Sequence, residues 1–192
     1  FALHGYKNAS LDRIFINLEI TKGAFYRYFN SKKSLYEYLI KYSRDKTFAH
    51  FEKIFLEPCD NLFDSWVEHY LETARLDKQY PLCSALLFSL IFERDHELYG
   101  NMLVHVKKRE VAVFKERFLE LQKKKKIKKH VDCDVLSYVF CLFHLGIYDF
   151  LAVHYNINVI ENIKKRKPLF DIPEEQLKKD LETFIRILLY GI

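Results

Sequence analysis

Side chains that could bind duplex DNA by hydrogen bonding and close approach gather between residues 10 and 32. The set combines hydroxyls, lysines and small residues: Ser10, Thr21, Lys22, Gly23, Ala24, Tyr26, Tyr28 and Lys32. Hydroxyl and ammonium groups donate hydrogen bonds to phosphate oxygens, whereas small residues let the end of a helix approach the base edges in a groove. This combination predicts a DNA-binding surface.

Two kinds of contact are expected from this set. Lys22 could donate to guanine acceptors and Ala24 could contact a thymine methyl group, so both would read sequence. The hydroxyls of Tyr26 and Tyr28 and the amine of Lys32 could reach flanking phosphates, where contacts fix position but carry no sequence information. Tyrosines at helical spacing are also common in plain helical cores, so the pattern alone leaves that alternative open.

The elements that must position these residues are three short helices. Ser10, Thr21 and Ser31 can each accept a hydrogen bond from the first turn of a following helix. Only residues 18–20 remain for the turn between the first two helices, which therefore cross sharply, as in a helix-turn-helix. The first helix has apolar residues at helical spacing: Leu11, Ile14, Phe15 and Leu18.

The formal net charge of +5 is concentrated in the N-terminal quarter of the 192 residues. Residues 1–46 hold six lysines and three arginines against two aspartates and two glutamates, so the remainder of the chain sums to zero. Positive charge beside the candidate surface would be attracted by DNA phosphates and would strengthen binding.

A longer pattern surrounds these helices: Gly5-Tyr6, Ser10, Ile14, Ile20-Thr21-Lys22-Gly23, Tyr26-Arg27-Tyr28-Phe29, Lys32 and Leu35. Over about residues 1–45 it resembles the DNA-binding domain of the tetracycline-repressor (TetR) family of bacterial transcriptional regulators. The resemblance implies phosphate-binding groups at Ser10, Tyr26, Tyr28 and Lys32, and residues close to the bases from Thr21 to Ala24.

The sequence departs from the family pattern around the turn. Phe15 and Leu18 stand where the family usually has small residues, and Glu19 stands where it has glycine. A left-handed backbone at Glu19 would cost about 1 kcal/mol relative to glycine, so we expect a turn of different shape. Because the chain opens at Phe1 without Met, we also expect the start of the first helix and any basic arm before it to be missing.

Residues 46–192 are predicted to form a second, helical domain for effector binding and dimerisation. Apolar periodicity predicts helices over residues 60–79, 81–94, 96–125, 132–155 and 174–190, and the third N-terminal helix is expected to run toward Phe55 and end at Pro58. The last helix is expected to end at Gly191. No alternating strand pattern competes, so the predicted fold class is all-α. The basic runs at 123–129 and 164–167 could be a second nucleic-acid patch, but we interpret them as a helix end and solvated loops.

The most apolar stretch runs from Val135 to Val153 and is long enough to span a membrane. His144 and Asp149 would be costly in lipid, so we expect instead a helix buried on most sides and no membrane association. The family resemblance implies the reason: the last two helices would pair with those of a second copy to make a homodimer, matching a palindromic operator.

The resemblance also implies a pocket for a small hydrophobic effector in the second domain. The aromatic and polar candidates to line it are Trp66, Tyr70, Phe114, His144 and Tyr148. Aromatic stripes at helical spacing need no ligand, so residues of this kind belong to an ordinary core more often than to a pocket.

We expect no enzyme, cofactor or metal site, because the histidines and acids form no catalytic triad and no ligand spacing. Cys59, Cys83, Cys133 and Cys141 form no Cys-x-x-Cys pair, which indicates buried, reduced thiols in a cytoplasmic protein.

The predicted function is a DNA-binding transcriptional regulator, expected to be a repressor released from its operator by the effector. A regulator without a small ligand and a helical interaction module are the alternatives.

Overall fold

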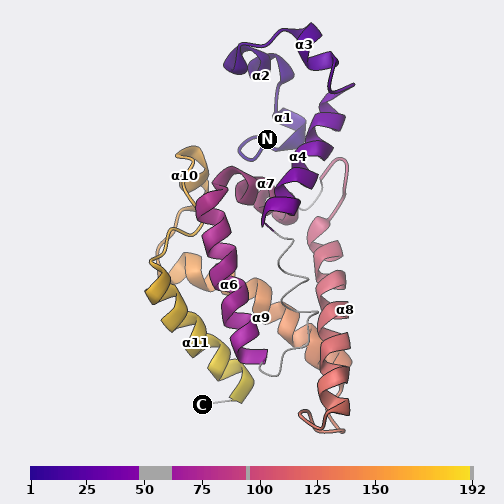
Figure 1. Ribbon diagram of the computed structural model, residues 1–192, viewed down its shortest axis with the longest axis vertical. Helices are drawn as coiled ribbons and strands as arrows, with labels where there is room; N and C mark the ends of the chain where they lie inside the picture. The colour runs from indigo at the N-terminus through magenta and orange to yellow at the C-terminus, as the bar shows by residue number, and fades with distance from the viewer. Residues whose placement is uncertain (48–61, 94–95, 191–192) are drawn as a thin grey trace.

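The computed structural model describes residues 1–47, 62–93 and 96–190 (Figure 1). Its helices are α1 (Gly5–Asn8), α2 (Leu11–Leu18), α3 (Lys22–Tyr26), α4 (Lys32–Thr47), α6 (Leu62–Gln79), α7 (Pro81–Phe92), α8 (Met102–Lys123), α9 (Cys133–His154), α10 (Val159–Lys164) and α11 (Glu174–Tyr190). Within these ranges the β-type pairing is confined to an isolated bridge between His96 and Gly100. The predicted all-α fold is confirmed.

The N-terminal helices α1 to α3 form one end of the long axis of the molecule, and α4 runs from them toward α7 (Figure 1). The predicted caps are present. Ser10 Oγ accepts from the Arg13 amide at 3.4 Å, and Thr21 Oγ1 accepts from the Ala24 amide at 3.1 Å. Ser31 Oγ accepts from the Ser34 amide at 3.1 Å. These bonds satisfy amides that the first turn of a helix leaves without an intrahelical partner.

Aromatic side chains fill the space between the short helices. The rings of Phe15 and Phe25 are 5.0 Å apart, and both residues are buried. Phe29 packs on Phe25 with ring centroids 5.5 Å apart. Leu18, which the periodicity places inward, is instead 63 % exposed, because α2 ends at this residue and the chain turns away from the core.

The remaining helices pack around an apolar core in which α8 lies along α9 and α6 lies along α11. Trp66 of α6 is fully buried and stacks on Phe140 of α9 at 4.7 Å between ring centroids. Phe118 of α8 meets the same ring edge-on at 4.6 Å. Rings in such offset and edge-on arrangements bury large areas and fix how the helices cross.

The predicted helix limits hold to within one residue for α9 and α11, and the predicted end of α6 at Gln79 and start of α7 at Pro81 also hold. The helix expected from residue 96 begins only at Met102, because the backbones of His96 and Gly100 pair with each other and Gly100 adopts a φ of 60°. The six-residue α10 was not predicted, and Lys164, expected in a loop, is its last residue. Helix α7 ends at Phe92, two residues before the expected end at Arg94. The expected continuation past Thr47 to Phe55 and Pro58, and the expected end at Gly191, lie outside the described residues.

Helix α9 is not buried on most sides in one chain, so that expectation is wrong for the single subunit. About a third (33 %) of its most apolar window is buried. Its exposed large apolar side chains are Val135, Tyr138, Val139, Leu142, Phe143 and Val153. Within the described ranges, α9 is also the one helix whose length and composition would let it cross a membrane.

Candidate functional site

The start of α3 is an open surface. Thr21, Lys22, Gly23 and Ala24 are all exposed, whereas Phe25, the next residue, is buried and anchors the helix. Since the Thr21 hydroxyl oxygen accepts from the Ala24 amide, it caps the helix and its own proton stays available for an outside acceptor. The first turn of α3 therefore presents small and basic groups to solvent.

Lys22 is tied loosely to the preceding helix. Its Nζ lies 3.0 Å from Asp12 Oδ1 of α2, and both side chains are about 70 % exposed (70 % and 69 %). An ion pair this exposed contributes little to stability, so the ammonium group can exchange Asp12 for another acceptor at small cost.

Gly23 is not required by the packing of the chain. A Cβ built at this position would lie 3.9 Å from Thr21 Oγ1, which is ordinary contact distance. The absence of a side chain therefore leaves free surface in front of α3 rather than relieving a clash inside the protein.

The aromatic hydroxyls flank this surface. Tyr28 is 83 % exposed and Tyr26 is 52 % exposed, so neither is a core residue. Lys32 is half-buried: its Nζ donates to the Lys7 carbonyl at 3.0 Å and lies 4.8 Å from the centre of the Tyr6 ring. Lys32 thus joins α4 to α1, an additional contact that the sequence pattern did not predict.

The turn at Glu19 keeps a left-handed backbone, with φ 53° and ψ 36°. Our expectation of a different turn shape is therefore wrong. The amides of Glu19 and Ile20 bond to the carbonyls of Ile16 and Phe15, at 3.2 and 3.0 Å, and these bonds hold the strained residue in place.

Residues 1–39 match the sequence model of a family described as bacterial regulatory proteins, tetR family. The chain carries the DNA-binding domain of the TetR family. No curated protein and no solved structure matches it. The matched residues include α1, α2, α3 and the first half of α4, and they make the protein a DNA-binding transcriptional regulator.

The regulator joins its DNA-binding domain to the rest of the chain through α4. This helix crosses the boundary expected at residue 45 and packs along α7. A second link is the pair Tyr36–His96, whose Oη and Nε2 atoms are 3.0 Å apart with both side chains buried. Because the Leu98 amide donates to His96 Nδ1 at 3.1 Å, the ring proton sits on Nε2 and is donated to Tyr36.

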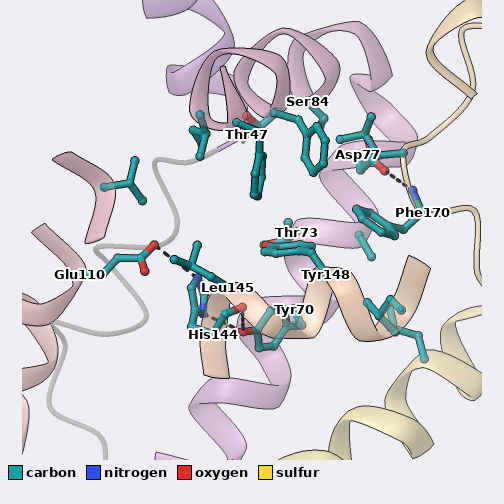
Figure 2. Close-up of a pocket in the computed structure, with 18 residues that line it drawn as sticks. Thr47, Tyr70, Thr73, Asp77, Ser84, Glu110, His144, Leu145, Tyr148 and Phe170 are labelled. Carbon is teal, nitrogen blue, oxygen red and sulfur yellow. Dashed lines mark hydrogen bonds and ion pairs between the residues drawn. The ribbon is translucent and has the colours of Figure 1, made fainter. Parts of the chain in front are cut away.

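A cavity lies between α4, α6, α7, α8 and α9, with about 890 Å³ of space between atoms when its opening to solvent is included (Figure 2). Most of its wall is apolar. The residues with polar groups on the wall are Thr47, Tyr70, Thr73, Asp77, Ser84, Glu110, His144 and Tyr148.

Three of the five predicted pocket residues line this cavity: Tyr70, His144 and Tyr148. Trp66 and Phe114 do not, and for these two the structure corrects the prediction. Both are at most 1 % exposed and belong to the packed core, where their rings lie 6.0 Å apart. For Trp66 and Phe114, the apolar periodicity therefore reflects packing between helices rather than a position on the cavity wall.

Tyr70, His144 and Glu110 form a chain of polar contacts on one side of the cavity (Figure 2). Tyr70 Oη is 2.7 Å from His144 Nδ1, and His144 Nε2 is 3.6 Å from Glu110 Oε1. Glu110 Oε2 also accepts from Cys141 Sγ at 3.5 Å. Burial lowers the pKa of His144 to about 3, so the imidazole is neutral at physiological pH.

Two carboxylates on the wall were not among the predicted site residues. Asp77 and Glu110 are 4 % and 7 % exposed. Burial raises the pKa of Asp77 to about 6 and that of Glu110 to about 7. Helical spacing could have indicated both positions. Asp77 lies seven residues after Tyr70, and Glu110 lies four residues before Phe114, so each shares the inward face of its helix with a buried aromatic residue.

Among the described residues, no group of three or more His, Cys, Asp or Glu could hold a metal ion. Cys133 and Cys141 are free and buried, as expected, whereas Cys83 is free and half-buried. Cys59 lies outside the described residues.

Proposed function

We propose that the regulator is a cytoplasmic homodimeric repressor, released from a palindromic operator when a small hydrophobic effector binds in the cavity. The observation that carries this proposal is the position of α4. Its N-terminal half lies in the DNA-binding domain, and its last residue, Thr47, lies on the cavity wall. Phe88, Ile91 and Phe92 of α7, which packs on α4, line the same wall.

A ligand that displaces α7 or the end of α4 would therefore move α3 along with α4. In a twofold dimer, two copies of α3 must be about one turn of DNA apart to enter successive major grooves. An effector that favours another separation lowers operator affinity, and by linkage the operator lowers effector affinity by the same factor.

The homodimer is supported by the apolar side chains that one chain leaves exposed on α9 and α11. Leu142, Phe143 and Ile187 are 47 %, 39 % and 50 % exposed. Phe143 also contacts Phe184 of α11 with ring centroids 6.0 Å apart, so the two helices share one apolar face. Exposed apolar patches of this kind mark association surfaces.

The test uses DNA from the promoter of the regulator's own gene and a scrambled fragment of equal length. We expect fluorescence anisotropy to show tighter binding to the promoter DNA. A thermal-shift panel of hydrophobic drugs, bile acids and fatty acyl compounds then identifies stabilising ligands. Each of these should release the DNA; a ligand that binds the protein and leaves operator affinity unchanged contradicts effector control, and equal binding to both fragments contradicts operator recognition.

A further inference from the structure

The strongest feature outside the DNA-binding surface is a pair of buried carboxyl groups inside an apolar cavity. Asp77 and Glu110 lie on opposite sides of it (Figure 2). None of the eighteen described residues that line the cavity is a lysine or arginine, and His144 is neutral. Buried carboxylates normally have a cationic partner, because an unpaired charge in an apolar environment is costly. Here the wall supplies none.

Asp77 is the carboxylate with an open acceptor. Its Oδ2 accepts from the Phe170 amide at 3.2 Å, and the Ser84 hydroxyl and the Leu169 amide also favour its charged form. The other oxygen, Oδ1, is buried and makes no hydrogen bond in the described structure. Glu110 differs, because both of its oxygens face groups of the protein, Cys141 and His144. A ligand that donates a hydrogen bond or carries a positive charge would therefore meet Asp77 first.

Aromatic rings surround the position next to Asp77. The backbone amide of Phe170 donates to Asp77, which keeps this residue beside the carboxylate. The Phe170 ring lies 5.6 Å from the Tyr148 ring and 6.4 Å from the Phe88 ring, measured between centroids. The Tyr148 ring in turn lies 6.0 Å from that of Tyr70. Aromatic faces attract cations, and more strongly where water is excluded.

We propose that the cavity binds an organic ammonium ion, with the cation at the Asp77 carboxylate among Phe88, Tyr148 and Phe170 and an apolar body reaching toward Glu110. A metal ion does not suit this wall, because the two carboxylates face each other across apolar space. An anionic ligand would be repelled by the Asp77 carboxylate, which is mostly ionised at neutral pH. This inference rests on the proposed function and names the chemical class of its effector.

The test compares three probes that share one apolar body: 4-phenylbutylamine, 4-phenylbutanol and 4-phenylbutyrate. At neutral pH we expect titration calorimetry to give the amine a Kd at least about tenfold lower than the alcohol, with the acid weaker still. Asp77→Asn should abolish the preference for the amine, and Glu110→Gln should reduce it. Glu116→Gln, an exposed acid on the same helix as Glu110, is the matched control and should retain it.

Asp77→Asn keeps the shape of the side chain and an oxygen for the Phe170 amide, and its fold is checked by circular dichroism. The proposal is overturned if the alcohol or the acid binds as tightly as the amine, if the amine does not bind, or if folded Asp77→Asn keeps the preference. Promoter binding is measured separately. An amine that binds without releasing DNA contradicts the proposed effector control alone, whereas promoter binding without amine binding contradicts this inference alone.

Discussion

Lys22 stands at the point where α3 would meet base edges. Its ion pair with Asp12 is exposed, so Lys22→Ala should leave the free energy of unfolding nearly unchanged. If the amine contacts bases, the same change should weaken operator binding about tenfold or more and reduce the preference over scrambled DNA.

The matched control for Lys22→Ala is Lys178→Ala. Lys178 is also an exposed lysine, on α11, with a side chain that is 57 % exposed and pairs with the Glu182 carboxylate. Anisotropy measurements with both variants separate a local contact from the loss of one charge. Equal operator affinities for the two variants would argue against a base contact at Lys22.

Glu19 offers a test of the strained turn. Glycine adopts a left-handed backbone without the steric cost that a Cβ imposes, so Glu19→Gly should raise the free energy of unfolding by about 1 kcal/mol at most. Glu37→Gly, inside α4, should lower it by about 1 kcal/mol, because glycine is unfavourable in a regular helix. Urea unfolding of both variants checks the opposite signs, and destabilisation by Glu19→Gly would contradict the role of strain.

The buried carboxyl of Glu110 predicts a pH dependence. Its pKa in the folded protein is about 7 against 4.5 in an unfolded chain, so between these values the folded state binds more protons. The stability of the wild type should therefore fall relative to Glu110→Gln as the pH rises from 4.5 to 7, by about 3 kcal/mol at most.

His144 has the opposite sign, because its lowered pKa makes the protein lose stability as the pH falls below 6.5. Asp77 is present in wild type and variant and lies across the cavity from Glu110, so its contribution cancels in the comparison. His144 lies 3.6 Å from Glu110, so the comparison is read above pH 6.5, where His144 is neutral in both the folded and the unfolded state, as well as below it. Denaturant unfolding at a series of pH values measures the difference in the free energy of unfolding between wild type and Glu110→Gln. Parallel stability curves would show that Glu110 is not desolvated as described.

At the scale of helices, the apolar face of α9 and α11 predicts the oligomeric state. Light scattering should give twice the 23.2 kDa of one chain at micromolar concentration. Leu142→Glu should produce monomers, because it places a charge within the apolar face. Leu82→Glu changes a side chain of α7 that is exposed to a similar extent, 50 % against 47 %, and should stay dimeric. A monomeric wild type would contradict the dimer.

The helices also show how far sequence reasoning reaches. The long apolar patterns of α9 and α11 predicted their limits, because many apolar positions at helical spacing agree. The start of α8 was wrong, since a tertiary contact, His96 with Tyr36, holds the preceding residues in a bridge. Trp66 and Tyr70 share the same helical face of α6, yet Tyr70 lines the cavity and Trp66 belongs to the packed core. Periodicity alone does not distinguish a residue of the cavity wall from a core residue.

At the scale of the whole molecule, the DNA-binding helices and the cavity lie in different places. The helices α2 and α3 lie at one end, and the basic run at 123–129 begins at the end of α8, at the opposite end (Figure 1). As interpreted from the sequence, Lys123 ends that helix and the run continues as a loop. The cavity lies between the ends, and α4 with the Tyr36–His96 contact connects it to the DNA-binding helices.

The central claim is that the positively charged N-terminal domain binds operator DNA, and a salt titration tests it most directly. The affinity for promoter DNA is measured at increasing salt, with scrambled DNA alongside. We expect the logarithm of the association constant to fall linearly with the logarithm of salt, with a slope steeper than about −4, and the promoter to remain preferred throughout. A flat dependence, or equal affinity for both DNAs at every salt concentration, would contradict the account.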